Sequence, residues 1–199
     1  MPEKKEIGFF YYDKLYSQGA ERYSEFFVDA PPNCVVGEAS PQYMYDEFCA
    51  ERISKHLPQL KLIFCVRNPL DRAFSHYKMN RRRGVETRSF NQVVSDWIEG
   101  NRSEDPEFKY IELGEYGRLV GNFLKYYSIN DMLIINSRDL KFNKRSTMEV
   151  IFDYLGLEFD ADLNVLNRNY HQAGDLRYPW INRLIHRGTK FPDFIKRII

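Results

Sequence analysis

A buried-strand pattern leads directly into a turn and the start of a helix between residues 60 and 77. Residues 62–66 read LIFCV, which is typical of a parallel strand that is covered on both faces. Arg67 stands where this strand ends, Asn68-Pro69 indicates a turn, and residues 71–77 have helical composition. Open α/β sheets bind ligands at the carboxyl ends of their strands, and helix N-termini favour anions. The segment therefore predicts a nucleotide-phosphate site in an α/β fold.

The rest of the chain alternates helical and extended patterns. Helices are expected over residues 17–27, 46–56, 70–82, 89–99, 116–127 and 146–155, and strands over residues 34–36, 60–66 and 132–136. Ser89 is a plausible N-cap for the fourth of these helices. This order predicts a parallel sheet with right-handed crossovers. The length of 199 residues favours one core, so residues 1–199 are expected to form a single domain.

Composition excludes several classes of protein. The three cysteines form no CxxC pair and the four histidines are scattered, so neither a disulfide scaffold nor a metal site is expected. The amino terminus is charged and no apolar run is long enough to span a membrane, which predicts a cytoplasmic protein without a membrane span. The net charge of +1 says little about partners, and no nucleic-acid partner is expected. The basic residues at 81–83 are equally consistent with anion binding and with a solvated helix face.

Arg67, Asn68-Pro69, Arg72 and Ser75 together resemble the 3′-phosphate-binding segment of the sulfotransferases that use 3′-phosphoadenosine 5′-phosphosulfate (PAPS). In that family the arginine at the strand end and the serine eight residues later hold the 3′-phosphate of the donor, which implies these roles for Arg67 and Ser75. A guanidinium offers a planar fork to phosphate, and a hydroxyl adds a neutral donor. The alternative interpretation is a charged strand end followed by a helix cap. His76 is expected to line a groove or to be structural, because successive helix residues face different directions.

Other segments resemble the same family in the same order. They read KEIGFF at residues 5–10, GEASPQY at 37–43, GEYG at 114–117 and FDYLGL at 152–157. The first two are closer to the heparan-sulfate-modifying and bacterial carbohydrate branch. The resemblance implies a three-layer α/β fold of the P-loop-NTPase-like sulfotransferase type, with helices flanking a parallel sheet. No segment matches the family's Pro-Lys-x-Gly-Thr loop, so an amino-terminally shortened fold is expected.

The resemblance also implies roles for residues outside the phosphate segment. Glu6 is the candidate catalytic base, because the glutamate before the Phe-Phe pair has this role in the heparan-sulfate-type relatives. The alternative is that Glu6 is a surface residue near the chain start. Lys5, Tyr116 and Arg177 are further candidate donor contacts. Those relatives also carry a lysine where this chain has Ala39, so one cationic contact is missing.

The implied activity is transfer of a sulfuryl group from PAPS, as co-substrate, to a hydroxyl or amine. A carbohydrate acceptor is favoured because sugars stack on aromatic rings, and aromatic residues make up 16% of the chain. A lipid or natural-product hydroxyl is the alternative acceptor, and a homo-oligomer is left open. The competing interpretation is a non-catalytic nucleotide- or glycan-binding remnant of the fold, since one donor-binding loop is unmatched. A P-loop kinase is excluded because Gly-x-x-x-x-Gly-Lys-[Ser/Thr] does not occur.

Overall fold

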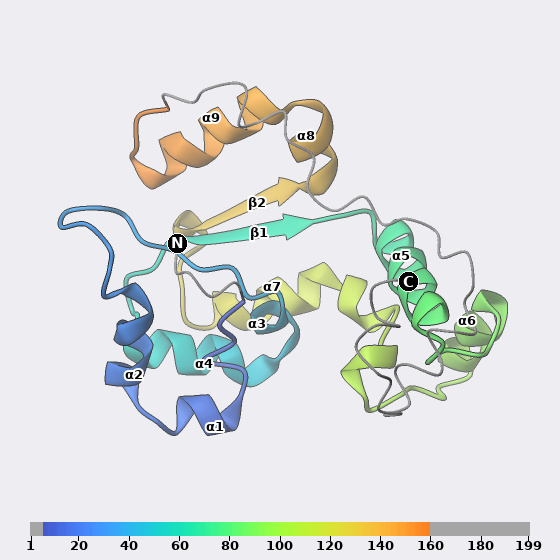
Figure 1. The fold of residues 1–199 in the computed structure, drawn as a ribbon. Helices are drawn as coiled ribbons and strands as arrows, with labels where there is room; N and C mark the ends of the chain where they lie inside the picture. The colour runs from blue at the N-terminus through green and yellow to red at the C-terminus, as the bar shows by residue number, and fades with distance from the viewer. Residues whose placement is uncertain (1–5, 160–199) are drawn as a thin grey trace, which may run out of the picture. The chain divides into compact units, whose positions relative to one another are not determined.

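The computed structural model describes residues 6–159, and these residues form two compact units (Figure 1). Unit 1 contains residues 6–66, 115–137 and 150–157, and unit 2 contains residues 67–114, 138–149 and 158–159. The chain therefore passes between the units several times. The expected single domain stays a prediction. Lys5 and Arg177 lie outside the described residues.

The sheet of unit 1 contains the two strands that the apolar runs predict. Strand β1 (Leu62–Val66) pairs in parallel with β2 (Met132–Asn136), with Leu62 opposite Met132. Figure 1 shows these two strands side by side. Phe64 of β1 is 6% exposed and its ring lies 5.2 Å from that of Phe123. The observed fold is thus α/β with parallel strands, as expected.

Helices of unit 1 supply the rest of its core. The helical elements are α1 (Asp13–Tyr16), α2 (Ala20–Ser24), η1 (Glu25–Phe27), α3 (Gln42–Tyr45), α4 (Glu47–His56), α7 (Tyr116–Leu124) and η4 (Ile129–Asp131). Asp46 caps α4 by accepting a hydrogen bond from the Phe48 N–H at 2.8 Å. The core gathers apolar side chains that are distant in sequence, among them Phe9, Phe10 and Phe123. Most of the helices expected in this unit are confirmed, with shifted ends.

The prediction of a strand at residues 34–36 is wrong. The structure assigns no regular element there, and Val35 and Val36 are 58% and 46% exposed. Three apolar residues carry β propensity, but that propensity is realised only when a neighbouring strand and a packed face are present. Here the segment has neither.

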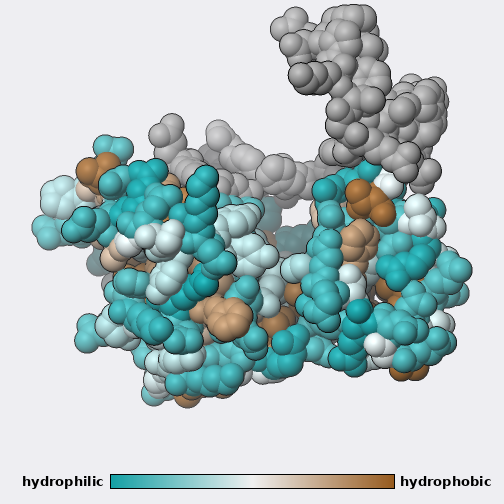
Figure 2. All heavy atoms as spheres, turned by 90° about the horizontal axis from the view of Figure 1, so that it is seen from below, coloured by the Kyte–Doolittle hydropathy of each residue, from teal (hydrophilic) through white to brown (hydrophobic). Residues whose placement is uncertain are grey.

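Figure 2 shows one face of the molecule, where apolar residues are scattered among hydrophilic ones.

Unit 2 is largely helical. Its elements are α5 (Pro69–Arg83), α6 (Phe90–Ile98), η2 (Pro106–Phe108), η3 (Glu112–Gly114) and most of α8 (Ser137–Phe142), and α9 (Lys144–Leu155) begins in it. The start of α5 is set by Asn68, whose side chain accepts from the N–H groups of Leu70 and Asp71 at 3.0 and 3.2 Å. Its end is set by Gly84 in the left-handed conformation, φ 73°. Ser89 caps α6, as expected.

A polar network lies in the core of unit 2. Asn80, Glu86 and Tyr110 are 0%, 3% and 1% exposed. Asn80 Nδ2 donates to Tyr110 Oη at 3.0 Å, and that hydroxyl donates to Glu86 Oε2 at 3.2 Å. Arg88 Nη2 donates to the same carboxylate at 2.8 Å. Because these buried polar groups satisfy one another, they hold the loop after α5 against its neighbours.

Two features are absent from the described part of the chain. Between residues 6 and 159, no helix is long and apolar enough to cross a membrane. Within the same range, no group of three or more histidine, cysteine, aspartate or glutamate side chains is arranged to hold a metal ion.

Substitution of Gly8 should destabilise unit 1. Gly8 has φ 67°, and an added Cβ would lie 2.6 Å from Cε2 of Tyr12. We expect Gly8→Ala to lower the free energy of unfolding by about 1 to 2 kcal/mol, the usual cost of a left-handed L-residue, before the clash is counted. Chemical denaturation measures this loss. Gly156→Ala is the matched control, because Gly156 of the same unit has a similar φ of 69° but nothing lies within 4 Å of an added Cβ. Equal losses in both variants would contradict a role for the Tyr12 contact.

Candidate functional site

An open pocket of about 280 Å³ lies beside α5, and its lining runs from the residue after β1 to the last turn of the helix. It is lined by Arg67, Arg72, Ser75, His76, Met79 and Arg82, all from unit 2. Arg67 directly follows β1, and the other five recur along α5 at the spacing of one helix face. The two residues that the sequence assigns to a 3′-phosphate, Arg67 and Ser75, thus line one pocket.

The position of Arg72 is fixed by the segment that precedes α7. Its Nη2 donates a hydrogen bond to the carbonyl oxygen of Tyr110. Gly114 of η3 packs tightly here, because a Cβ on it would lie 3.2 Å from Cβ of Pro69 and 3.6 Å from Nε of Arg72. The first turn of α5 is therefore held against η3, with a guanidinium anchored beside the pocket. Guanidinium groups next to a helix N-terminus are suited to binding anions.

His76 is an uncharged member of this pocket at neutral pH. Burial lowers the pKa of its imidazole, and the positive charges of Arg72 and Arg83 lower it further, while Glu107 acts in the opposite direction. Its ring packs edge-on against Tyr110, with centroids 4.9 Å apart. Among the described residues, its buried Nδ1 has no hydrogen-bond partner. The expectation that His76 lines a groove is confirmed.

Sequence reasoning did not assign Met79 and Arg82 to the site. Both line the pocket, and both follow Ser75 at helical spacing, four and seven residues later. A helical projection from Ser75 would have found them. Arg82 was recognised only as part of a basic run.

Glu6 and Tyr116 lie in unit 1. Glu6 is exposed and has φ 56°, and it immediately precedes Ile7, which is 1% exposed. The segment that follows is therefore anchored in the core. Tyr116 is half-buried and is the first residue of α7. The structure brings Arg67 and Ser75 to one pocket and places these two candidates in the other unit.

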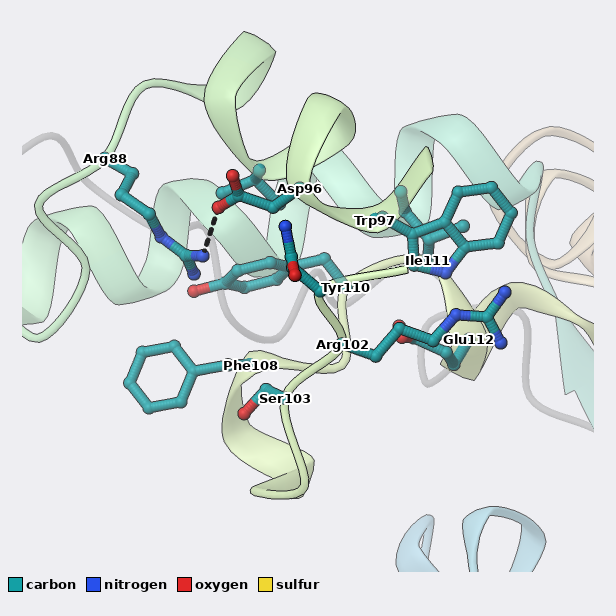
Figure 3. Close-up of a pocket in the computed structure, with 11 residues that line it drawn as sticks. Arg88, Asp96, Trp97, Arg102, Ser103, Phe108, Tyr110, Ile111 and Glu112 are labelled. Carbon is teal, nitrogen blue, oxygen red and sulfur yellow. Dashed lines mark hydrogen bonds and ion pairs between the residues drawn. The ribbon is translucent and has the colours of Figure 1, made fainter. Parts of the chain in front are cut away.

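A second pocket in unit 2 is too small for a substrate. Figure 3 shows its lining, which includes Arg88, Asp96, Trp97 and Tyr110. The cavity is about 20 Å³, which is space for about one water molecule. The Arg88 guanidinium donates to Asp96 across 2.8 Å, as the dashed line in Figure 3 marks. Its role is structural.

Comparisons with known sequences identify relatives. Residues 42–176, more than half of the chain, match the family described as "Sulfotransferase domain". The bifunctional heparan sulfate N-deacetylase/N-sulfotransferase 2 of Homo sapiens is 30% identical over 165 residues, which cover 77% of this chain and 18% of that protein. The heparan sulfate glucosamine 3-O-sulfotransferase 6 of Mus musculus is 24% identical over 148 residues, covering 74% of this chain and 43% of that protein. The chain thus spans less than half the length of either relative.

Comparisons with solved structures agree on the fold. A sulfotransferase from Alicyclobacillus acidocaldarius superposes with a TM-score of 0.69 at 24% identity, covering 85% of this chain and 75% of that one. The sulfotransferase domain from the curacin biosynthetic pathway gives a TM-score of 0.54 at 17% identity, covering 82% of this chain and 54% of that one. At these identities the likeness concerns the fold alone.

Proposed function

Because the chain belongs to the sulfotransferase domain family, we propose that it binds PAPS and takes part in transfer of the sulfuryl group to a hydroxyl or amine of a carbohydrate. The observation that carries this proposal is the pocket beside α5, which Arg67 and Ser75 line together. The named relatives act on heparan sulfate, and this supports a carbohydrate acceptor. A cytoplasmic setting and a homo-oligomer stay predictions.

The chemistry of the pocket fits a 3′-phosphate. Its described lining includes three guanidinium groups and one hydroxyl, and no carboxylate. Arginine pairs with phosphate through two parallel hydrogen bonds. His76 is neutral, so it adds no charge to the three arginines.

The proposed reaction needs a base on the acceptor side. PAPS supplies the activated sulfuryl group when bound. The acceptor oxygen or nitrogen forms the new bond to sulfur and loses its proton, while the bond from sulfur to the nucleotide phosphate breaks and 3′-phosphoadenosine 5′-phosphate leaves. Glu6 is the proposed acceptor of that proton. Arg67 and Ser75 hold the nucleotide by its 3′-phosphate, at a distance from the reacting bond.

Titration calorimetry with 3′-phosphoadenosine 5′-phosphate tests the donor site. Adenosine 5′-phosphate is the control, because it lacks only the 3′-phosphate. We expect the first nucleotide to bind and the second to bind at least ten-fold more weakly. Equal affinities, or no binding of either, would contradict the assignment of the pocket. Binding without turnover on any polysaccharide would favour the non-catalytic alternative.

Removal of the Ser75 hydroxyl should have a smaller effect than removal of an arginine. We expect Ser75→Ala to weaken binding of 3′-phosphoadenosine 5′-phosphate by about 1.5 kcal/mol, the lower end for a hydrogen bond to a charged group. The same calorimetric titration measures the change. Ser95→Ala, at an exposed position of α6 in the same unit, should leave the affinity unchanged. A Ser75→Ala variant that binds as tightly as the parent protein would remove Ser75 from the site.

A further inference from the structure

A half-buried carboxylate in unit 1 accepts hydrogen bonds from three hydroxyl groups. Glu38 lies in the GEASPQY segment, and its oxygens accept from Ser40 Oγ at 3.2 Å and from Tyr23 Oη at 3.4 Å. Tyr43 supplies the third hydrogen bond. The group is distinct from the pocket at α5, because all four residues belong to unit 1.

Two of these hydroxyls also hold the backbone of the segment that follows Glu6. Ser40 Oγ accepts from the Gly8 N–H at 3.0 Å, and Tyr43 Oη accepts from the Phe10 N–H at 3.4 Å. An ionised carboxylate can only accept hydrogen bonds. Each hydroxyl group therefore donates its proton to Glu38. The lone pairs of the Ser40 and Tyr43 hydroxyls then accept from the N–H groups of Gly8 and Phe10. All hydrogen bonds of the network thus run in one direction, from backbone N–H through hydroxyl to the Glu38 carboxylate.

Glu6, two residues before the held Gly8, has a strained backbone. Glu6 and Gly8 both have positive φ, 56° and 67°, and for the non-glycine residue this costs about 1 to 2 kcal/mol. The side chains of Phe9 and Phe10 are 0% and 1% exposed. Their burial also anchors the segment. Strained conformations persist where the surroundings over-determine them, and they gather at functional sites.

We propose that Glu38 is a positioning residue, which sets the place of the Glu6 carboxylate by holding the Gly8 and Phe10 backbone through Ser40 and Tyr43. The reactive role of Glu6 rests on the proposed function. The hold on the backbone does not, because it follows from the hydrogen bonds alone.

The positioning role of Glu38 is separate from the effect of its charge on the stability of the fold. Burial raises the pKa of its carboxyl group, and the hydrogen bonds from Tyr43, Ser40 and Tyr23 offset this only in part. A carboxyl group with a raised pKa stabilises the fold below its unfolded pKa, and that contribution is lost as the pH rises through the folded pKa. At neutral pH the charge of Glu38 is thus a cost to the fold. Glu38→Gln removes this charge, so the variant is expected to fold.

The test compares Glu38→Gln with Glu47→Gln, an exposed glutamate at the start of α4. Three quantities are measured: exchange of the Gly8 and Phe10 amide protons by NMR, affinity for 3′-phosphoadenosine 5′-phosphate, and kcat and KM with PAPS and desulfated heparan sulfate. We expect Glu38→Gln to raise both exchange rates and to lower kcat at least ten-fold. KM and nucleotide affinity should stay within two-fold, and Glu47→Gln should change nothing. Ser40→Ala is the second variant should Glu38→Gln not fold, and it should raise exchange at Gly8 most.

The outcomes distinguish the positioning role of Glu38 from the proposed function. Unchanged amide exchange in a folded variant would overturn the proposal. Faster exchange with unchanged kcat would also overturn it, because the segment would then not act through Glu6. A parent protein that transfers no sulfuryl group would refute the proposed function alone, and amide exchange would still decide whether Glu38 holds the backbone.

Discussion

Replacement of Arg67 by alanine should weaken binding of 3′-phosphoadenosine 5′-phosphate by about 2 to 4 kcal/mol, roughly 30-fold to 900-fold in the dissociation constant. Arg67 follows the end of β1 and lines the pocket together with Arg72 and Ser75 of α5. Loss of its guanidinium would leave the 3′-phosphate without its bidentate partner. Because Arg67 is exposed, the lower half of this range is expected.

Titration calorimetry of the folded variant measures the effect. Arg145→Ala is the matched control, because Arg145 belongs to the same unit but forms an exposed ion pair with Glu149, at 2.9 Å. The control should bind the nucleotide like the parent protein. Adenosine 5′-phosphate should bind equally to both variants, since it lacks the 3′-phosphate that Arg67 is proposed to bind. A normal affinity in Arg67→Ala would refute the site.

Replacement of Glu86 by alanine should lower the free energy of unfolding by about 1 to 3 kcal/mol, the usual cost of leaving buried hydrogen-bond donors without an acceptor. Glu86 is 3% exposed. Its carboxylate accepts from the N–H groups of Thr87 and Arg88, both at 2.8 Å, from the Arg88 guanidinium and from Tyr110 Oη. The alanine variant would leave the buried Tyr110 hydroxyl without this acceptor, whereas the Arg88 guanidinium, which is 40% exposed, can bind water instead.

Chemical denaturation measures the loss, with Glu149→Ala as control at an exposed ion pair. The control should change stability by less than about 0.5 kcal/mol. A loss of similar size in both variants would show that the Glu86 network does not stabilise unit 2.

The stabilisation by Glu86 should also depend on pH. Burial raises the pKa of its carboxyl group, but the hydrogen bonds and charge of Arg88 outweigh burial, so the pKa is lowered overall. A carboxyl group with a lowered pKa stabilises the fold above its unfolded pKa of about 4.3, and the contribution is lost as the pH falls through the folded pKa. The stability difference between the parent protein and Glu86→Gln should therefore shrink below about pH 4. A difference that is constant from pH 3 to 7 would contradict this.

The sequence by itself determined the elements that depend on local signals. The apolar runs predicted β1 and β2, and Asn68-Pro69 predicted the start of α5, because a cap and a turn are built from adjacent residues. Arg67 and Ser75 were predictable as one site for the same reason. Arg67 directly follows β1, Ser75 lies in the second turn of α5, and no distant contact is needed to bring them to one pocket.

Only the tertiary structure decided the parts that depend on contacts between distant residues. The strand expected at residues 34–36 did not form, because apolar residues become a strand only against a partner. Ser40 and Tyr43 hold the Gly8 and Phe10 amides across 32 and 33 residues. No pattern within either segment encodes such a pairing. The same holds for Asn80 and Tyr110, which are 30 residues apart. Which buried polar groups satisfy one another is decided when the chain folds, since each can be buried only where a partner already lies.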